Sequence, residues 1–174
     1  MSRLLAVFVG LAVLLLVPAV AAARDSRDIR IQDRCDPATF NAVFGDGVCI
    51  KEGGVTLDEF LAQLNPKDGG DNHWRFKPTQ THLEPGGHLD IVNEGGETHS
   101  FTEVVDFGAT PIPAFALLNN ALPADTPFAV PVGADLHFVP SGGALRLDNL
   151  SVGTHKFECF IHPWMRTTIE QRSD

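Results

Sequence analysis

From His73 to the C-terminus, glycine and proline divide the chain into short segments in which apolar and polar residues alternate. Alternation with a period of two residues is typical of half-buried β-strands. The segments expected to form strands are residues 74–76, 88–92, 100–105, 134–139, 144–147, 154–160 and 165–170. Many short strands at this spacing predict an all-β fold of the β-sandwich type. The Pro- and Ala-rich stretch 106–131 is the exception, and we expect a helical turn within residues 115–122.

The segment before the strands has the signals of two short helices. Asp36 can cap the first helix, with Pro37 at its first position and Gly45 after its end. Thr56 and Glu59 have the spacing of a capping box, which predicts a second helix over residues 57–64. Its apolar residues recur at helical spacing and must pack against something, so we expect a helical cap on the β-sandwich. Residues 24–34 are highly charged, and we expect them to be loose.

The N-terminus has the pattern of a secretory signal peptide. Arg3 precedes an apolar run from Leu4 to Val17, and alanines follow at alternating positions up to Ala23. The alternative is a membrane anchor, but the run is shorter than the roughly 20 apolar residues that a spanning helix needs. We therefore divide the chain into a signal peptide (1–23), a helical extension (24–70) and a β-sandwich domain (71–174), and we expect a secreted or periplasmic protein without stable membrane insertion.

The three cysteines divide into a pair and a single residue. Cys35 and Cys49 lie 14 residues apart, whereas Cys159 stands alone near the C-terminus. Export leads to an oxidising compartment, so Cys35 and Cys49 are expected to form a disulfide. Cys159 is then an unpaired thiol whose presence needs a reason.

The charge of the chain restricts its partners. The formal net charge is −9, and loss of Arg3 with the signal peptide makes the mature protein more negative by one unit. A chain of this charge is repelled by a phosphate backbone, so nucleic acid is not an expected partner.

A Cys-x-x-His-x-x-Met motif carries the chemistry of this sequence. Cys159 sits where a predicted strand leaves the sheet, and His162 and Met165 follow in a tight loop that can turn all three side chains towards one point. Thiolate, imidazole and thioether together suit copper. Zinc is possible in principle, but a thioether ligand argues against it. A buried free thiol at Cys159 and core packing of Met165 are the simpler interpretations, and the fixed spacing to His162 favours metal binding.

A second imidazole must come from elsewhere in the chain, and His99 is the best candidate because it follows a glycine turn and opens a strand. The simpler interpretation of His99 is a hydrogen-bonded strand histidine. Two histidines, one cysteine and a weak axial methionine describe a blue-copper site. We expect His99 to be buried in the scaffold, and His162 to be partly exposed in its loop and to act as the electron port.

The stretch Gly153-Thr154-x-x-Phe157-x-Cys159-x-x-His162 resembles the C-terminal signature of the plastocyanin family. The continuation Cys159-x-x-His162-Pro163-Trp164-Met165-Arg166 is especially similar to the amicyanin type of cupredoxin. Membership of this family implies a Greek-key β-sandwich, one type 1 copper per chain and one-electron transfer. By motif it implies His99, Cys159, His162 and Met165 as the copper ligands. The helical extension and the length of residues 106–131 depart from a minimal cupredoxin.

The sequence thus predicts an exported, mononuclear copper protein that carries single electrons between redox proteins of unknown identity, acts as a monomer and is not an enzyme. The alternative is a copper storage or delivery protein without a redox partner. A copper enzyme would need a second copper centre with its own histidines.

Overall fold

The computed structural model describes residues 25–64, 70–108 and 136–173. The expected signal peptide (residues 1–23) and the helical turn expected within residues 115–122 lie outside these residues. Among the described residues, no helix has the length and apolar character needed to cross a membrane.

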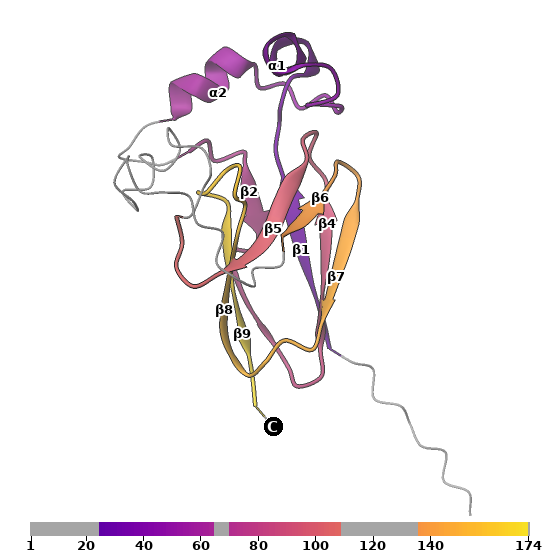
Figure 1. Ribbon diagram of the computed structural model, residues 1–174, viewed down its shortest axis with the longest axis vertical. Helices are drawn as coiled ribbons and strands as arrows, with labels where there is room; N and C mark the ends of the chain where they lie inside the picture. The colour runs from indigo at the N-terminus through magenta and orange to yellow at the C-terminus, as the bar shows by residue number, and fades with distance from the viewer. Residues whose placement is uncertain (1–24, 65–69, 109–135, 174) are drawn as a thin grey trace, which may run out of the picture.

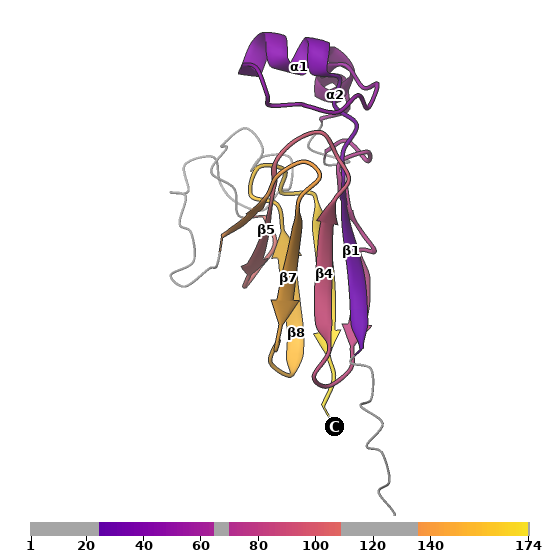
Figure 2. The ribbon, with the colours of Figure 1, turned by 90° about the vertical axis from the view of Figure 1, so that its right-hand side faces the viewer.

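Two β-sheets form the body of the protein (Figures 1 and 2). The first has the strand order β2-β1-β4-β7, with β1 at Ser26–Gln32, β2 at Arg75–Lys77, β4 at His88–Asn93 and β7 at Ala144–Asp148. The second has the order β3-β9-β8-β5-β6, with β3 at Gln80–Leu83, β5 at His99–Val104, β6 at His137–Val139, β8 at Gly153–Glu158 and β9 at Arg166–Gln171. The predicted all-β sandwich with a short helical extension is confirmed.

The hydrophobic core lies between the two sheets. The first sheet contributes Ile29, Ile91 and Phe76, which are fully buried. The ring of Phe76 packs 5.2 Å from that of Phe101 in the second sheet, and Phe101 stacks on Phe157 at 4.5 Å. Aromatic contacts at these separations add to the hydrophobic stabilisation of the core.

Strand β1 corrects the expectation that residues 24–34 are loose. It lies inside the first sheet, antiparallel to β2 and parallel to β4. Ile29 and Ile31 point into the core, whereas Asp28 and Arg30 are exposed on the other face. Because an antiparallel or mixed sheet can leave one face in water, charged residues are compatible with this strand. The sandwich therefore begins at β1 and not at residue 71. Strand β3 was also not predicted.

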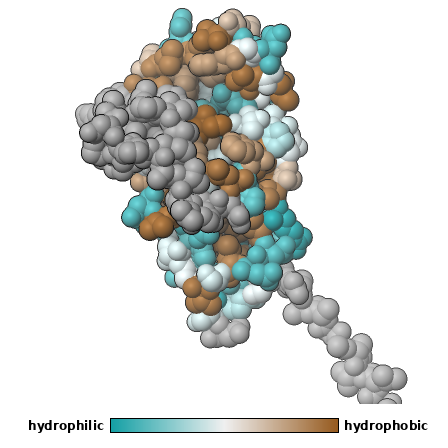
Figure 3. Space-filling view, in the orientation of Figure 1, coloured by the Kyte–Doolittle hydropathy of each residue, from teal (hydrophilic) through white to brown (hydrophobic). Residues whose placement is uncertain are grey.

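Two helices cover one end of the sandwich, opposite the C-terminus (Figures 1 and 2). Helix α1 spans Pro37–Phe44 and helix α2 spans Leu57–Gln63. The predicted caps are confirmed, because Asp36 accepts a hydrogen bond from the Thr39 N–H and Thr56 forms a capping box with Glu59. We call residues 35–64 the cap. Hydrophobic atoms gather on its outer surface (Figure 3).

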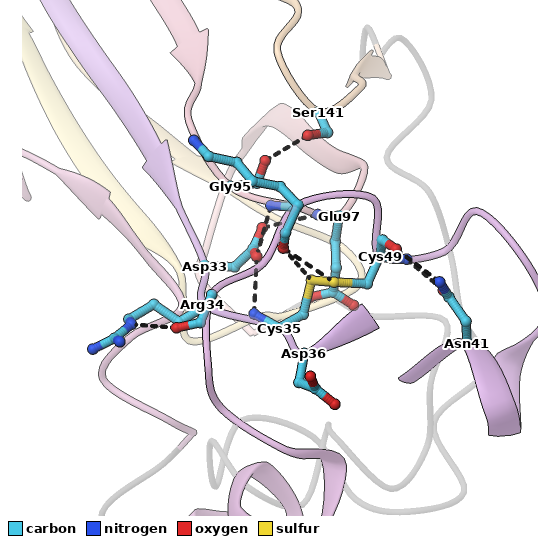
Figure 4. The surroundings of a disulfide bond; sticks show 12 residues. Asp33, Arg34, Cys35, Asp36, Asn41, Cys49, Gly95, Glu97 and Ser141 are labelled. Carbon is cyan, nitrogen blue, oxygen red and sulfur yellow. Dashed lines mark hydrogen bonds between the residues drawn. A yellow bond between two sulfur atoms is a disulfide. The ribbon is translucent and has the colours of Figure 1, made fainter. Parts of the chain in front are cut away.

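A disulfide fixes the cap to the sandwich. Cys35, just after β1, is bonded to Cys49 in the segment between α1 and α2, which confirms the predicted pairing (Figure 4). Asn41 of α1 exchanges two hydrogen bonds with the backbone of Cys49. The N–H of Ile50 donates to the carbonyl of Gly96 in the loop between β4 and β5. The cap is therefore joined covalently and by hydrogen bonds to the end of the sandwich.

We predict that the variant with both Cys35→Ala and Cys49→Ala is less stable than the wild type by about 3 kcal/mol, because opening a loop of this size returns conformational entropy to the unfolded chain. Urea unfolding at pH 7 measures this difference. Reductant should lower the wild-type midpoint and leave the variant unchanged. A wild-type midpoint that does not respond to reductant would contradict the prediction.

Candidate metal centre

A narrow loop between β8 and β9 presents the first two donor side chains. Cys159 directly follows β8, and its N–H donates to the carbonyl of Met165 at 3.1 Å. The N–H of Met165 donates to the carbonyl of His162 at 2.8 Å. These two hydrogen bonds hold the two ends of the loop together. As a result, Cys159 and His162 lie on the same side of the loop, towards β5.

His99 is the first residue of β5, and the turn before it is held by Asn93. The amide of Asn93 donates to the carbonyl of Glu97 at 2.8 Å, and its oxygen accepts from the N–H of Gly95 at 2.9 Å. Asn93 also donates to the carbonyl of Val139. This buried side chain therefore ties the turn to its surroundings and fixes the point at which His99 enters the sheet.

Ser100 connects the two halves of the site. Its hydroxyl oxygen accepts a hydrogen bond from the N–H of Phe160 at 2.8 Å, and both residues are buried. Since Ser100 follows His99 and Phe160 follows Cys159, this bond sets the distance between the strand and the loop.

Three donor atoms meet at one point inside the protein. The Nδ1 atoms of His99 and His162 lie 3.7 Å and 3.9 Å from the Sγ of Cys159, and 3.3 Å from each other. The circle through three atoms with these separations has a radius of about 2.1 Å, which matches the 2.0–2.3 Å bonds that nitrogen and sulfur form with a metal ion such as zinc. All three side chains are buried. The donor set and its spacing therefore fit a bound metal ion.

Met165 is fully buried at the end of the same loop. Its backbone closes the loop, as described above. Binding of its thioether to the metal stays a prediction.

A buried carboxylate that the sequence did not single out holds His99. Asp33, just after β1, lies 2.8 Å from the Nε2 of His99. Its two oxygens also accept from the N–H groups of Gly96 at 2.8 Å and Glu97 at 3.1 Å. Asp33 lies beside Cys35 and Glu97 (Figure 4). Because the carboxylate accepts a hydrogen bond from the Nε2–H group, Nδ1 is the ring nitrogen left to bind a metal.

The turn between β4 and β5 needs glycine at two successive positions because it approaches Asp33 and the disulfide so closely. A side chain at Gly95 would collide with the Asp33 carboxylate, and one at Gly96 would collide with the sulfur of Cys35. Carboxylate, disulfide and glycine turn therefore pack as one unit behind His99.

The electrostatics of the site favour the thiolate form of Cys159. Burial raises the pKa of Cys159, but hydrogen bonds from His162 and His99 and the charge of these imidazoles outweigh it, and the pKa lies well below its usual value. Burial lowers the pKa of His99, but the hydrogen bond to Asp33 and the nearby Cys159 raise it to about 10. Burial likewise raises the pKa of Asp33, and its bonds to His99 and to backbone N–H groups lower it overall. A thiolate is the form in which cysteine binds metals.

The position of His162 corrects the expectation of a partly exposed port. His99 is buried as expected, but His162 is also buried, with 4% of its surface exposed. The rings of Phe60, Trp74 and Trp164 surround His162 at 6.2, 6.4 and 5.4 Å. Phe60 belongs to α2, so the cap covers the edge of the imidazole that the sequence placed in solvent.

Glu97 lies on the outer side of His162. One of its carboxylate oxygens is 3.8 Å from His162 Nε2 and accepts a hydrogen bond from the indole N–H of Trp74. Glu97, Trp74 and Phe60 were not predicted as site residues, because nothing in their local sequence places them beside the Cys-x-x-His motif.

No family model and no curated protein sequence matches this chain. Similar solved structures include a mutant of amicyanin in the Cu(I) form, with 16% identity and a TM-score of 0.37 over 56% of this chain and 73% of amicyanin. A purple cupredoxin from Nitrosopumilus maritimus is 10% identical, with a TM-score of 0.45 over 83% of this chain and 98% of that protein.

We predict that Asp33→Asn destabilises the metal-free protein at pH 7 by about 2–3 kcal/mol, because an amide cannot accept all the hydrogen bonds that the carboxylate accepts. The folded-state pKa of Asp33 is lowered, so its stabilisation is complete above the unfolded-state pKa of about 3.9 and is lost as pH falls through the folded-state pKa. The difference from wild type should therefore shrink below about pH 4.

Urea unfolding between pH 3 and pH 7 measures this effect. The exposed residue Asp148 provides the control, since Asp148→Asn should leave stability nearly unchanged at each pH. Equal effects of the two substitutions at pH 7 would contradict the role given to Asp33.

Proposed function

We propose that this chain is an exported protein with one type 1 copper, which carries single electrons between redox partners. The observation that carries the proposal is the convergence of one thiolate and two imidazole nitrogens at metal-binding distance inside the protein. Copper bound there would supply a reversible one-electron Cu(II)/Cu(I) couple.

The types of donor favour copper over other metals. Oxygen-preferring ions such as Mg²⁺ and Ca²⁺ do not match a thiolate and two imidazoles. We propose Met165 as a fourth, weak axial donor, because a buried thioether at the end of the ligand loop completes the set that blue-copper sites use.

The chain supports electron transfer by holding its donors in place. The Asp33–His99 and Ser100–Phe160 hydrogen bonds fix β5 and the ligand loop relative to each other. Because the donors are buried and held before the metal binds, little of the protein has to move when one electron is gained or lost. A small rearrangement is what an electron carrier requires.

The burial of the donor side chains argues against the alternative of a copper storage or delivery protein. Delivery requires ligands that exchange easily, whereas His162 lies beneath three aromatic rings. In the described part of the chain, both groups of side chains able to hold a metal contain His99, so we expect one copper per chain and propose no enzymatic reaction. Fast electron self-exchange without loss of copper would separate a carrier from a storage protein.

Export is supported by the disulfide between Cys35 and Cys49, which persists in an oxidising compartment such as the periplasm. We propose that the protein acts there as a monomer on soluble redox partners.

We predict that the copper-loaded wild type has an intense visible absorption band from charge transfer between the Cys159 thiolate and Cu(II), and that Cys159→Ala abolishes this band. An absorption spectrum and a copper analysis test this, with one copper per chain expected in the wild type. Asp148→Asn, on the exposed face of the sandwich, is the control and should keep the band. Retention of the band in Cys159→Ala would refute the assignment of the site.

We predict that Met165→Leu, which nearly conserves volume, keeps the visible band and raises the reduction potential. An axial thioether stabilises Cu(II) more than Cu(I), so its removal favours the reduced state. Voltammetry at neutral pH measures the change, and Leu83→Met in the distant core is a control for side-chain exchange. An unchanged potential in Met165→Leu would mean that Met165 only fills space.

A further inference from the structure

The burial of His162 raises the question of where an electron enters. A partner protein has almost none of the imidazole to touch, because His162 is buried and the rings of Phe60 of α2, Trp74 and Trp164 pack around it. The rate of electron tunnelling falls exponentially with distance. An electron that reaches the site through His162 must therefore pass through the aromatic rings that cover it.

The rings that cover His162 continue outward to the surface of the cap. Phe60 packs 4.6 Å from Trp74 and 5.6 Å from Phe40 of α1. Phe40 stacks on Trp74 at 5.8 Å, with 16° between the ring planes, and lies 6.2 Å from Phe44. Phe40, Phe60 and Trp74 are buried, whereas Phe44 is 56% exposed. We call these four residues the aromatic bridge.

The bridge ends among other exposed apolar side chains of the cap. Val43, Ile50 and Leu61 are each at least half exposed, as is Phe44. These four residues, which we call the cap patch, make up half of the large exposed hydrophobic residues in the described part of the chain. Hydrophobic atoms gather over α1 and α2 in Figure 3. Exposed apolar groups that gather on one surface are typical of interaction sites.

Negative charge accompanies the patch. Residues 36–64 contain five acidic side chains and one basic side chain, Lys51. The Lys51 ammonium donates to the carbonyl of Glu94. The acidic residues Asp46, Glu52 and Asp58 are exposed. Such a surface attracts a partner with basic residues around an apolar contact and repels a second copy of this acidic chain.

We propose that the cap patch is the docking surface for an electron-transfer protein whose apolar contact surface is bordered by basic side chains, and that the aromatic bridge is the electron route between Phe44 and His162. This proposal rests on the proposed copper function. In each transfer one electron leaves the reduced partner and converts Cu(II) to Cu(I), so the partner is oxidised by one electron and no bond is made or broken.

Stopped-flow mixing of the copper-loaded, oxidised protein with a reduced, basic c-type cytochrome tests the docking surface. Phe44→Ser should lower the second-order rate constant by about tenfold, as expected when a central apolar contact is truncated. Val152, 67% exposed just before β8 at the end of the sandwich away from Cys159, provides the control, and Val152→Ser should leave the rate near the wild-type value. Reduction by ascorbate should be the same in all three proteins.

Two double variants test whether the negative charge of the cap attracts the basic partner. The double variant Asp46→Lys and Glu52→Lys should slow the reaction with the cytochrome and weaken its dependence on salt. The double variant Asp28→Lys and Glu170→Lys makes the same change in net charge on the sandwich and should have a much smaller effect. Equal effects of the two pairs would overturn the docking surface.

The bridge is tested at saturating cytochrome, where docking no longer limits the rate. Phe40→Leu should slow the first-order transfer several-fold, whereas Leu83→Val, in the core beside the end of β9, should not. Unchanged visible spectra in both variants establish that they are folded and hold copper. An unchanged rate in Phe40→Leu would overturn the route.

The outcomes separate this inference from the proposed function. A wild type that binds no copper with a thiolate band refutes the proposed function itself. A blue wild type whose Phe44→Ser variant reacts at the wild-type rate refutes only the docking surface. A wild-type dimer in sedimentation that Phe44→Ser converts to a monomer would show that a second copy occupies the patch, and the proposal would be wrong.

Discussion

The hydrogen bond between Asp33 and His99 is the interaction on which the rest of this end of the molecule depends. Asp33 follows β1 of one sheet, and His99 begins β5 of the other. The same carboxylate accepts hydrogen bonds from the N–H groups of Gly96 and Glu97, which form the turn into β5. A buried carboxylate is costly unless such bonds satisfy it, so the turn, the strand and the imidazole are held in one arrangement.

The position of Asp33 also explains why the cap and the site belong together. Two residues further along, Cys35 forms the disulfide to Cys49, and Gly96 lets both sulfur atoms approach the turn. A short piece of chain thus anchors His99 on one side and the cap on the other. Any displacement of the cap would disturb the residues behind His99, and the cap is therefore part of the site and not only an addition to the fold.

The sequence predicted the features that depend on neighbouring residues. The helix caps at Asp36 and Thr56 need only a bond to an N–H three residues away, so their spacing is visible in the sequence. The Cys159–His162 loop is similarly local. Strand β1 escaped prediction because Ile29 and Ile31 are its only large apolar residues, and its partner β4 lies about 60 residues away.

Asp33 and the burial of His162 escaped prediction for the same physical reason. Asp33 looks like any of its charged neighbours until the sheet brings it to His99. His162 looks like an exposed loop residue until Phe60, 102 positions earlier in the numbering, packs on its edge. A motif identifies the donors of a site, whereas the insulation of the site depends on long-range packing that a motif does not contain.

Insulation and coupling are opposing demands on an electron carrier, and the cap offers a way to meet both. A layer of aliphatic side chains over His162 would exclude water but would also lengthen the electron path. Here the covering layer consists of rings in mutual contact, from Phe60 and Trp74 to Phe40 and Phe44. Aromatic rings exclude water as well as aliphatic side chains do, and they provide π-orbitals along the way. The burial of His162 therefore need not isolate the centre, because the residues that cover it can also conduct.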